Sequence, residues 1–163
     1  KQKKNYRSRW IWFKNKKTNY YKMKKILIIN SNYYKKISHN LVLNAKKKLL
    51  SSKFKISILD TPGAFEIPIV IRKNIKKFDG FVALGCIIKG ETPHFELICS
   101  SVFNSILNLS VNYNKPIGNG IITALNLNQA IERSVNINSN KPNKGLEAAN
   151  SVISVIKNSA KKI

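Results

Sequence analysis

Residues 81–94 read FVALGCIIKGETPH, a nearly continuous apolar run followed by a polar segment that ends in histidine. The run at 81–86 has the length and hydrophobicity of a strand that is buried on both faces of a parallel sheet. A similar run lies at 26–29, and two further strand-like segments lie at 55–59 and 116–123. We therefore predict four strands, of which the segment at 81–86 is the third.

Apolar residues recur at helical spacing between these strands. In the first such segment, Ile37, Leu41, Ala45 and Leu49 recur every four residues, with lysines at outward positions. Similar spacing predicts helices at 67–75, 95–109 and 146–160 and a short helix at 130–133. Strands that alternate with helices are typical of an α/β domain, in which helices cover both faces of a parallel sheet.

Unusual polar, glycine and proline residues follow each predicted strand. They lie at 30–34, 62–66, 87–94 and 123–126. In parallel α/β folds, ligands bind beyond the carboxyl ends of the strands, which share one edge of the sheet. Four such segments at one edge therefore indicate a binding site there.

The segment 87–94 has the residue types of an anion-binding loop. Gly90 permits unusual backbone angles and Lys89 adds positive charge, while the Thr92 hydroxyl and backbone amides precede a predicted helix N-terminus. An ordinary helix-capping loop explains the same residues equally well. Neither G-x-G-x-x-G nor a Walker sequence is present, so a nucleotide cofactor is not indicated.

His94 is the candidate proton-transfer residue. It lies at the predicted start of a helix, where imidazolium is disfavoured and a neutral imidazole can move protons. A surface histidine that caps the helix is the alternative interpretation. His39, in contrast, falls in the middle of a lysine-rich helix and is expected to be solvated.

Two other segments contain candidate ligand-binding residues. Glu66 lies at a predicted helix start and could accept hydrogen bonds from a donor-rich ligand, while Phe65 could belong to the core or offer a stacking surface. Arg133 suits bidentate phosphate binding and is one of four arginines. Lys144 is one of 26 lysines and indicates little by itself.

The composition excludes several classes of protein. No run of about 18 apolar residues is present to span a membrane. Cys86 and Cys99 are too few for a secreted disulfide scaffold and are interpreted as reduced core thiols, and no Cys/His cluster has zinc spacing.

The formal charge of +23 suggests nucleic acid or an anionic membrane as partner. However, Lys, Asn and Ile make up 70 of 163 residues, and their A- and T-rich codons explain much of that charge without nucleic-acid binding.

Residues 1–22 differ from the rest of the chain. They contain nine basic residues and no acid, and they lack any helical or alternating period. The regular pattern begins directly after Met23, the only methionine. We interpret 1–22 as a disordered or non-native basic extension and 23–163 as the folded domain. A targeting segment, or a basic aromatic arm that binds RNA or a membrane, is the alternative.

Four stretches of the chain resemble the 6,7-dimethyl-8-ribityllumazine synthase family: PGAFEIP at 62–68, ALGCIIKGETPHFE at 83–96, QAIER at 129–133 and NKG at 143–145. The similarity extends from about residue 23 to the C-terminus. It implies a flavodoxin-like, three-layer α/β/α sandwich with a four-stranded parallel sheet. It also implies a bacterial, cytoplasmic transferase that forms homopentamers or multiples of pentamers and associates with riboflavin synthase, with neither nucleic acid nor membrane as partner.

The resemblance implies the penultimate step of riboflavin biosynthesis. In this reaction 5-amino-6-(D-ribitylamino)uracil condenses with 3,4-dihydroxy-2-butanone 4-phosphate, releasing phosphate and water, with no metal or organic cofactor. His94 would transfer protons. The pyrimidine would bind to Tyr33, Ala64, Phe65, Glu66, Cys86, Ile87, Ile88 and Asn119. The butanone phosphate would bind to Glu91, Thr92, Arg133 and Lys144.

The chain departs from the family pattern at several positions. Asn32 and Lys89 stand where Arg is common, Tyr33 replaces Phe or Trp, Asn119 replaces Phe, and Leu125 replaces an acidic residue. A degenerate relative that retains only lumazine or flavin binding, or only shell assembly, is therefore the alternative function. The choice among a pentamer, a decamer and a 60-subunit shell stays open.

Overall fold

The computed structural model describes residues 23–135 and 143–158, which form four strands and five helices. The strands are β1 (Lys25–Ser31), β2 (Lys55–Thr61), β3 (Gly80–Ile88) and β4 (Ile117–Ala124). Every neighbouring pair is parallel, and the strand order is β2-β1-β3-β4. The predicted four-stranded parallel sheet is confirmed.

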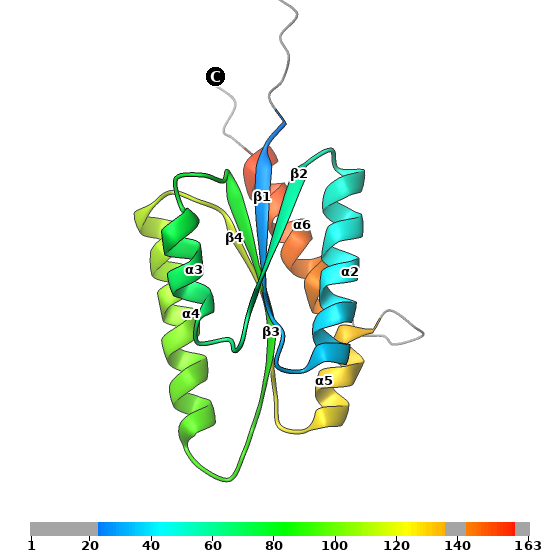
Figure 1. Ribbon diagram of the computed structural model, residues 1–163, viewed down its shortest axis with the longest axis vertical. Coiled ribbons are helices and arrows are strands. Elements are labelled where there is room, and N and C mark those ends of the chain that lie inside the picture. Colours follow the sequence, from blue (N-terminus) through cyan, green and yellow to red (C-terminus); the bar gives the residue numbers. More distant parts are fainter. Residues whose placement is uncertain (1–22, 136–142, 159–163) are drawn as a thin grey trace, which may run out of the picture.

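Helices cover both faces of this sheet (Figure 1). One face carries α2 (Lys35–Ser51), α5 (Leu127–Ser134) and α6 (Lys144–Lys157), and the other carries α3 (Ile67–Asn74) and α4 (His94–Asn112). The architecture is thus the predicted three-layer α/β/α sandwich, and each predicted helix is present.

The hydrophobic core is divided into two clusters, one on each face of the sheet, and alternate residues of a central strand belong to one cluster or the other. Ile26 and Ile28 of β1 pack in the cluster with α2 and α6, whereas Leu27 and Ile29 pack in the cluster with α3 and α4. The central strands β1 and β3 are therefore buried on both faces, which explains their continuous apolar sequences. The edge strand β2 is mostly exposed instead.

Two glycines allow α6 to lie very close to its neighbours. A Cβ added at Gly118 of β4 would lie 2.1 Å from the carbonyl oxygen of Ala148, and one at Gly145 would lie 2.2 Å from that of Leu41. Neither distance leaves room for a side chain, so α6 packs directly on β4 and on α2. The first turn of α6 is closed by the Asn143 side chain, which accepts hydrogen bonds from the Gly145 and Leu146 amides.

The carboxyl ends of the strands share one edge of the sheet with the N-terminal ends of α2 and α4 (Figure 1). All four strands extend farther toward this edge than predicted, since they end at Ser31, Thr61, Ile88 and Ala124. Ile87 and Ile88, predicted to lie in the loop, pair with β4 and shorten that loop to 89–93. Among the described helices, none combines the length and hydrophobicity needed to cross a membrane.

Candidate active site

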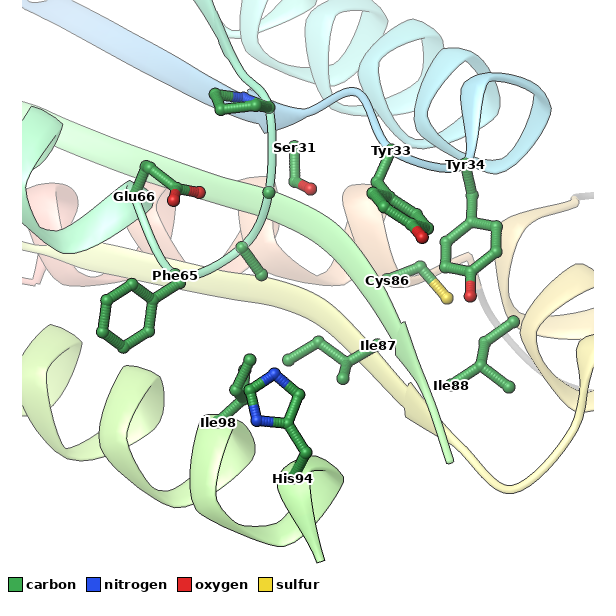
Figure 2. A pocket seen from close by; sticks show the side chains of 13 residues that line it. Ser31, Tyr33, Tyr34, Phe65, Glu66, Cys86, Ile87, Ile88, His94 and Ile98 are labelled. Carbon is green, nitrogen blue, oxygen red and sulfur yellow. The ribbon is translucent and has the colours of Figure 1, made fainter. Parts of the chain in front are cut away.

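A cavity of about 620 Å³ opens at the carboxyl ends of β1 and β3, between the start of α2 and the start of α4 (Figure 2). Three segments that follow β1, β2 and β3 contribute to its walls, as the strand-end rule predicts. The lining residues are Ser31, Tyr33, Tyr34, Pro62, Gly63, Ala64, Phe65, Glu66, Cys86, Ile87, Ile88, His94 and Ile98.

Tyr33 forms one wall from the turn between β1 and α2. Its side chain is 71% exposed, and its ring meets the Tyr34 ring edge-on, with centroids 4.9 Å apart. The edge-on contact uses only part of the Tyr33 ring, so a flat ligand can stack on it.

The segment after β2 forms the opposite side of the cavity. The Thr61 hydroxyl donates to the Gly63 carbonyl at 2.8 Å, and the Ile67 amide donates to the Ala64 carbonyl at 3.2 Å, which fixes a tight turn before α3. Phe65 projects from this turn and is 62% exposed, so it is a surface ring rather than a core residue. Glu66 caps α3 through its backbone, and its side chain makes no capping hydrogen bond.

The end of β3 forms the apolar floor. Cys86 is buried, and burial raises the pKa of its thiol to about 12, so it is not a nucleophile at neutral pH. Ile87 and Ile88 are half-buried beside it. Cys86 and Cys99 are both free thiols, as predicted, although Cys99 is only partly buried.

His94 is the first residue of α4 and is exposed. Its imidazole points into the cavity, across from Tyr33 and near Ile98 and Phe65 (Figure 2). His94 does not cap the helix, because the N-cap residue is Pro93 and no side chain makes a capping hydrogen bond. His39 is exposed within α2, as predicted.

The loop that follows β3 differs from the expected anion loop in one respect. No described glycine has a positive φ, so Gly90 does not adopt the unusual backbone angle expected of it, and a Cβ there would meet nothing. Glu91 and Thr92 are exposed in this loop and lie outside the cavity lining. The amides at the start of α4 have no side-chain cap, so the alternative interpretation as an ordinary capping loop is wrong.

Three further predicted site residues lie outside the cavity lining of their own chain. Asn119 is exposed on the edge strand β4, where its Oδ1 accepts a hydrogen bond from the Ile121 amide at 3.0 Å. Arg133 lies in the last turn of α5, and Lys144 opens α6 and pairs with Glu147. Neither helix contributes to the cavity lining.

Some lining residues were not singled out from the sequence. Ser31 ends β1 and Tyr34 follows it, and both lie in the polar segment predicted at 30–34, where nothing in the sequence separates them from their neighbours. Ile98 was assigned to the apolar stripe of α4, which it shares with core residues.

The interpretation of residues 1–22 as a basic extension lies outside the described residues, as do positions 136–142 between Arg133 and Lys144.

A parallel α/β/α domain with aromatic rings, a carboxylate and an imidazole around one strand-end cavity has the arrangement of an enzyme for small molecules. Residues 23–160 match the family model described as 6,7-dimethyl-8-ribityllumazine synthase. The chain belongs to this family.

Three relatives carry the same name. The protein of Bartonella tribocorum is 38% identical over 135 residues, which cover 81% of this chain and 89% of the relative. That of Campylobacter jejuni is 39% identical over 137 residues, or 81% and 87% of the two chains. That of Afipia carboxidovorans is 36% identical over 140 residues, or 82% and 84%.

These similarities confirm the predicted family and, with it, a lumazine synthase function in riboflavin biosynthesis. They favour an active enzyme over a degenerate relative that retains only binding or assembly. Members of the family are generally oligomeric and bind small-molecule substrates.

Proposed function

We propose that the cavity at the carboxyl ends of β1 and β3 condenses 5-amino-6-(D-ribitylamino)uracil with 3,4-dihydroxy-2-butanone 4-phosphate. The observation that carries this proposal is that Tyr33, Phe65 and His94 open onto one cavity from three different strand-end segments. In this reaction the pyrimidine amine condenses with the ketone to an imine and releases one water, and phosphate is then eliminated. The ribitylamino nitrogen attacks the remaining carbonyl carbon, and loss of a second water there closes the ring.

The pyrimidine occupies the part of the cavity between Tyr33 and the Ala64–Glu66 segment. Its flat ring stacks on the exposed Tyr33 ring, and Phe65 covers the ribityl side. The Glu66 carboxylate accepts hydrogen bonds from the donor-rich substrate. Cys86, Ile87 and Ile88 contribute backbone groups and apolar surface to the floor.

The butanone phosphate occupies the side of the cavity near the start of α4. Its phosphate is held at the uncapped helix N-terminus beside Glu91 and Thr92. His94 transfers protons between the two reactants during imine formation and ring closure. Holding both reactants in line replaces a bimolecular encounter, and such positioning contributes several kcal/mol, about 7–11 at most.

A second copy of the chain completes the site in a pentamer or a multiple of pentamers. In this arrangement Asn119 and Arg133 of one copy face Phe65 and His94 of the next, with Lys144 nearby. Two observations support it. Arg133 and Lys144 lie outside the cavity of their own chain, and an apolar groove of about 510 Å³ beside the cavity includes Phe65 and the exposed Ile69.

The domain that performs this reaction spans residues 23–163, and residues 1–22 precede it as a basic extension. The match of residues 23–160 to the family model supports this boundary. We further propose that the enzyme acts in the cytoplasm and associates with riboflavin synthase, which uses its product.

Incubating the full chain with both substrates tests the reaction. We expect phosphate release in step with the appearance of lumazine absorbance, and a folded oligomer that forms neither product contradicts the proposal.

Mixing His94→Gln and Arg133→Ala protein tests the shared site. If the two residues come from different copies, reassembled mixtures regain activity that neither variant has alone. Native mass measurement determines the number of copies.

A further inference from the structure

One polar group in the cavity wall has no partner within the described part of the chain. Ser31, the last residue of β1, is 1% exposed and lines the cavity. Its hydroxyl oxygen is fully buried and makes no hydrogen bond. A buried hydroxyl that lacks a partner destabilises the fold, so its presence at a cavity wall suggests that a ligand supplies the partner.

The neighbours of Ser31 on both sides leave its hydroxyl without a partner: the Thr61 hydroxyl of β2 donates to the Gly63 carbonyl oxygen instead. Gly85 of β3 lies against it, and a Cβ at Gly85 would come within 2.9 Å of the Ser31 Cβ. This neighbour therefore offers no side chain that could bond. The Ser38 hydroxyl is close, but it donates to the Ser31 carbonyl oxygen at 2.5 Å and so fixes the backbone instead.

The position of Ser31 relates it to one part of the cavity. Figure 2 shows its side chain between Tyr33 and the segment that carries Phe65 and Glu66. This is the part assigned above to the pyrimidine ring, and it lies away from the start of α4, where the phosphate is assigned. A ring that stacks on Tyr33 presents its polar edge toward this wall.

We propose that Ser31 is a substrate-binding residue whose hydroxyl pairs with a carbonyl oxygen or ring N–H at the edge of the pyrimidinedione. A hydroxyl can donate or accept, so it fits either atom. The inference rests on the proposed function, because it takes the pyrimidine as the occupant of the cavity. It adds a residue that neither the motifs nor the family resemblance indicated.

This role has a thermodynamic signature that a structural hydroxyl lacks. In the free protein, Ser31→Ala removes an unpaired buried hydroxyl, so the variant unfolds at the same or a higher temperature than the parent. In the complex it removes a hydrogen bond, so binding weakens. Replacing a serine whose hydroxyl only stabilises the fold gives the opposite pattern, in which the Tm falls and ligand binding does not change. Ser110 is such a residue, since its hydroxyl donates to the Lys115 carbonyl at 2.7 Å far from the cavity.

The experiment compares Ser31→Ala, Ser31→Cys and the control Ser110→Ala in the full-length oligomer. We measure the Tm, the Kd of 6,7-dimethyl-8-ribityllumazine by fluorescence titration, inhibition by inorganic phosphate, and the KM of each substrate. For Ser31→Ala we expect lumazine binding to weaken about fivefold, the value of one neutral hydrogen bond. The KM of the aminopyrimidine should rise by a similar factor, with the KM of the butanone phosphate and the phosphate inhibition unchanged.

The variants also separate the alternatives. Ser31→Cys keeps the side-chain shape but is a weak donor, so its affinity should fall between those of the parent and Ser31→Ala. Ser110→Ala should lower the Tm and leave the Kd unchanged. Parental affinity in Ser31→Ala, or an equal loss of lumazine and phosphate binding, overturns the inference.

Failure of the inference and failure of the proposed function give different results. If the parent protein turns over both substrates but Ser31→Ala binds lumazine normally, only the role of Ser31 is wrong. If the parent forms no product but binds lumazine in a Ser31-dependent way, the binding role holds and the reaction is wrong.

Discussion

The ammonium group of Lys89 donates a hydrogen bond to the carboxylate of Glu96 over 2.7 Å, and both side chains are about half exposed. The basic residue beside the proposed phosphate position is therefore already paired with a carboxylate on α4. The hydrogen bond from Lys89 lowers the pKa of the Glu96 carboxyl group. We expect this pairing to weaken the attraction of the loop for an anion.

The substitution Glu96→Gln should release Lys89 toward the phosphate position. Because the pair is exposed, we expect the Tm to change little and the inhibition by inorganic phosphate to strengthen about twofold at low salt. Phosphate inhibition of turnover measures the effect, with Asp79→Asn as control. That carboxylate pairs with Lys24, away from the cavity. Equal phosphate inhibition in the parent and in Glu96→Gln would show that Lys89 does not contact the anion.

His94 is expected to act in proton transfer rather than in folding. It is exposed at the start of α4, so His94→Gln should keep the Tm and the oligomer while lowering kcat by about 10²-fold or more. Steady-state phosphate release above the enzyme-free background gives kcat. His39→Gln is the matched control, because His39 is exposed within α2 and should be dispensable. Undiminished kcat in His94→Gln would require a different proton-transfer group.

Substitutions at Phe65 and at Phe81 should have different effects, one on substrate binding and the other on the stability of the fold. Phe65 is 62% exposed at the cavity, so Phe65→Ala should leave the Tm nearly unchanged and raise the KM of the aminopyrimidine about fivefold. Phe81 is fully buried in β3, so Phe81→Ala should lower the free energy of unfolding by about 3–5 kcal/mol. Urea unfolding and steady-state kinetics on both variants measure the two effects. A large loss of stability in Phe65→Ala would mean that Phe65 is needed for packing.

Cys86 should make stability depend on alkaline pH. Burial raises the pKa of its thiol from 9.0 to about 12. Above pH 9 the unfolded chain therefore loses this proton before the folded chain does, and the free energy of unfolding falls as the pH rises from about 9 to 12. Below pH 9 the thiol is protonated in both states and contributes no pH dependence.

Comparing the parent with Cys86→Ala over this range isolates the contribution of the thiol. The parent should be the more stable protein at pH 8, and its advantage in Tm should shrink as the pH increases. Cys99→Ala serves as comparison, because Cys99 is less buried and should give a smaller trend. A constant difference in Tm between the parent and Cys86→Ala would mean that the Cys86 thiol is not protected from ionisation.

The layered fold could be predicted from periodicity because each element has one dominant environment. The runs at 26–29 and 81–86 are buried on both faces and therefore lack polar interruptions. The four-residue spacing from Ile37 to Leu49 reports the single buried face of α2. The strand ends were less accurate, because Ile88 is equally compatible with a strand and with an apolar loop.

The candidate site could be predicted only in part, because it depends on three-dimensional placement. The segments that hold Tyr33, Phe65 and His94 follow strands, and the parallel topology brings them to one edge. The sequence could not decide whether Phe65 is core or surface, since both environments accept an aromatic ring. The missing partner of Ser31 is likewise not visible in the sequence, because it depends on which residues the sheet places beside it, among them Gly85.

The crystal structure of the full-length oligomer soaked with 6,7-dimethyl-8-ribityllumazine tests the central claim most directly. We expect the ring to stack on Tyr33, its ribityl chain to lie along Phe65 and Glu66, and the His94 imidazole to face the newly formed ring. Lumazine bound elsewhere, for example in the polar hollow between β2 and α2 around Asn40 and Asp60, would contradict the account.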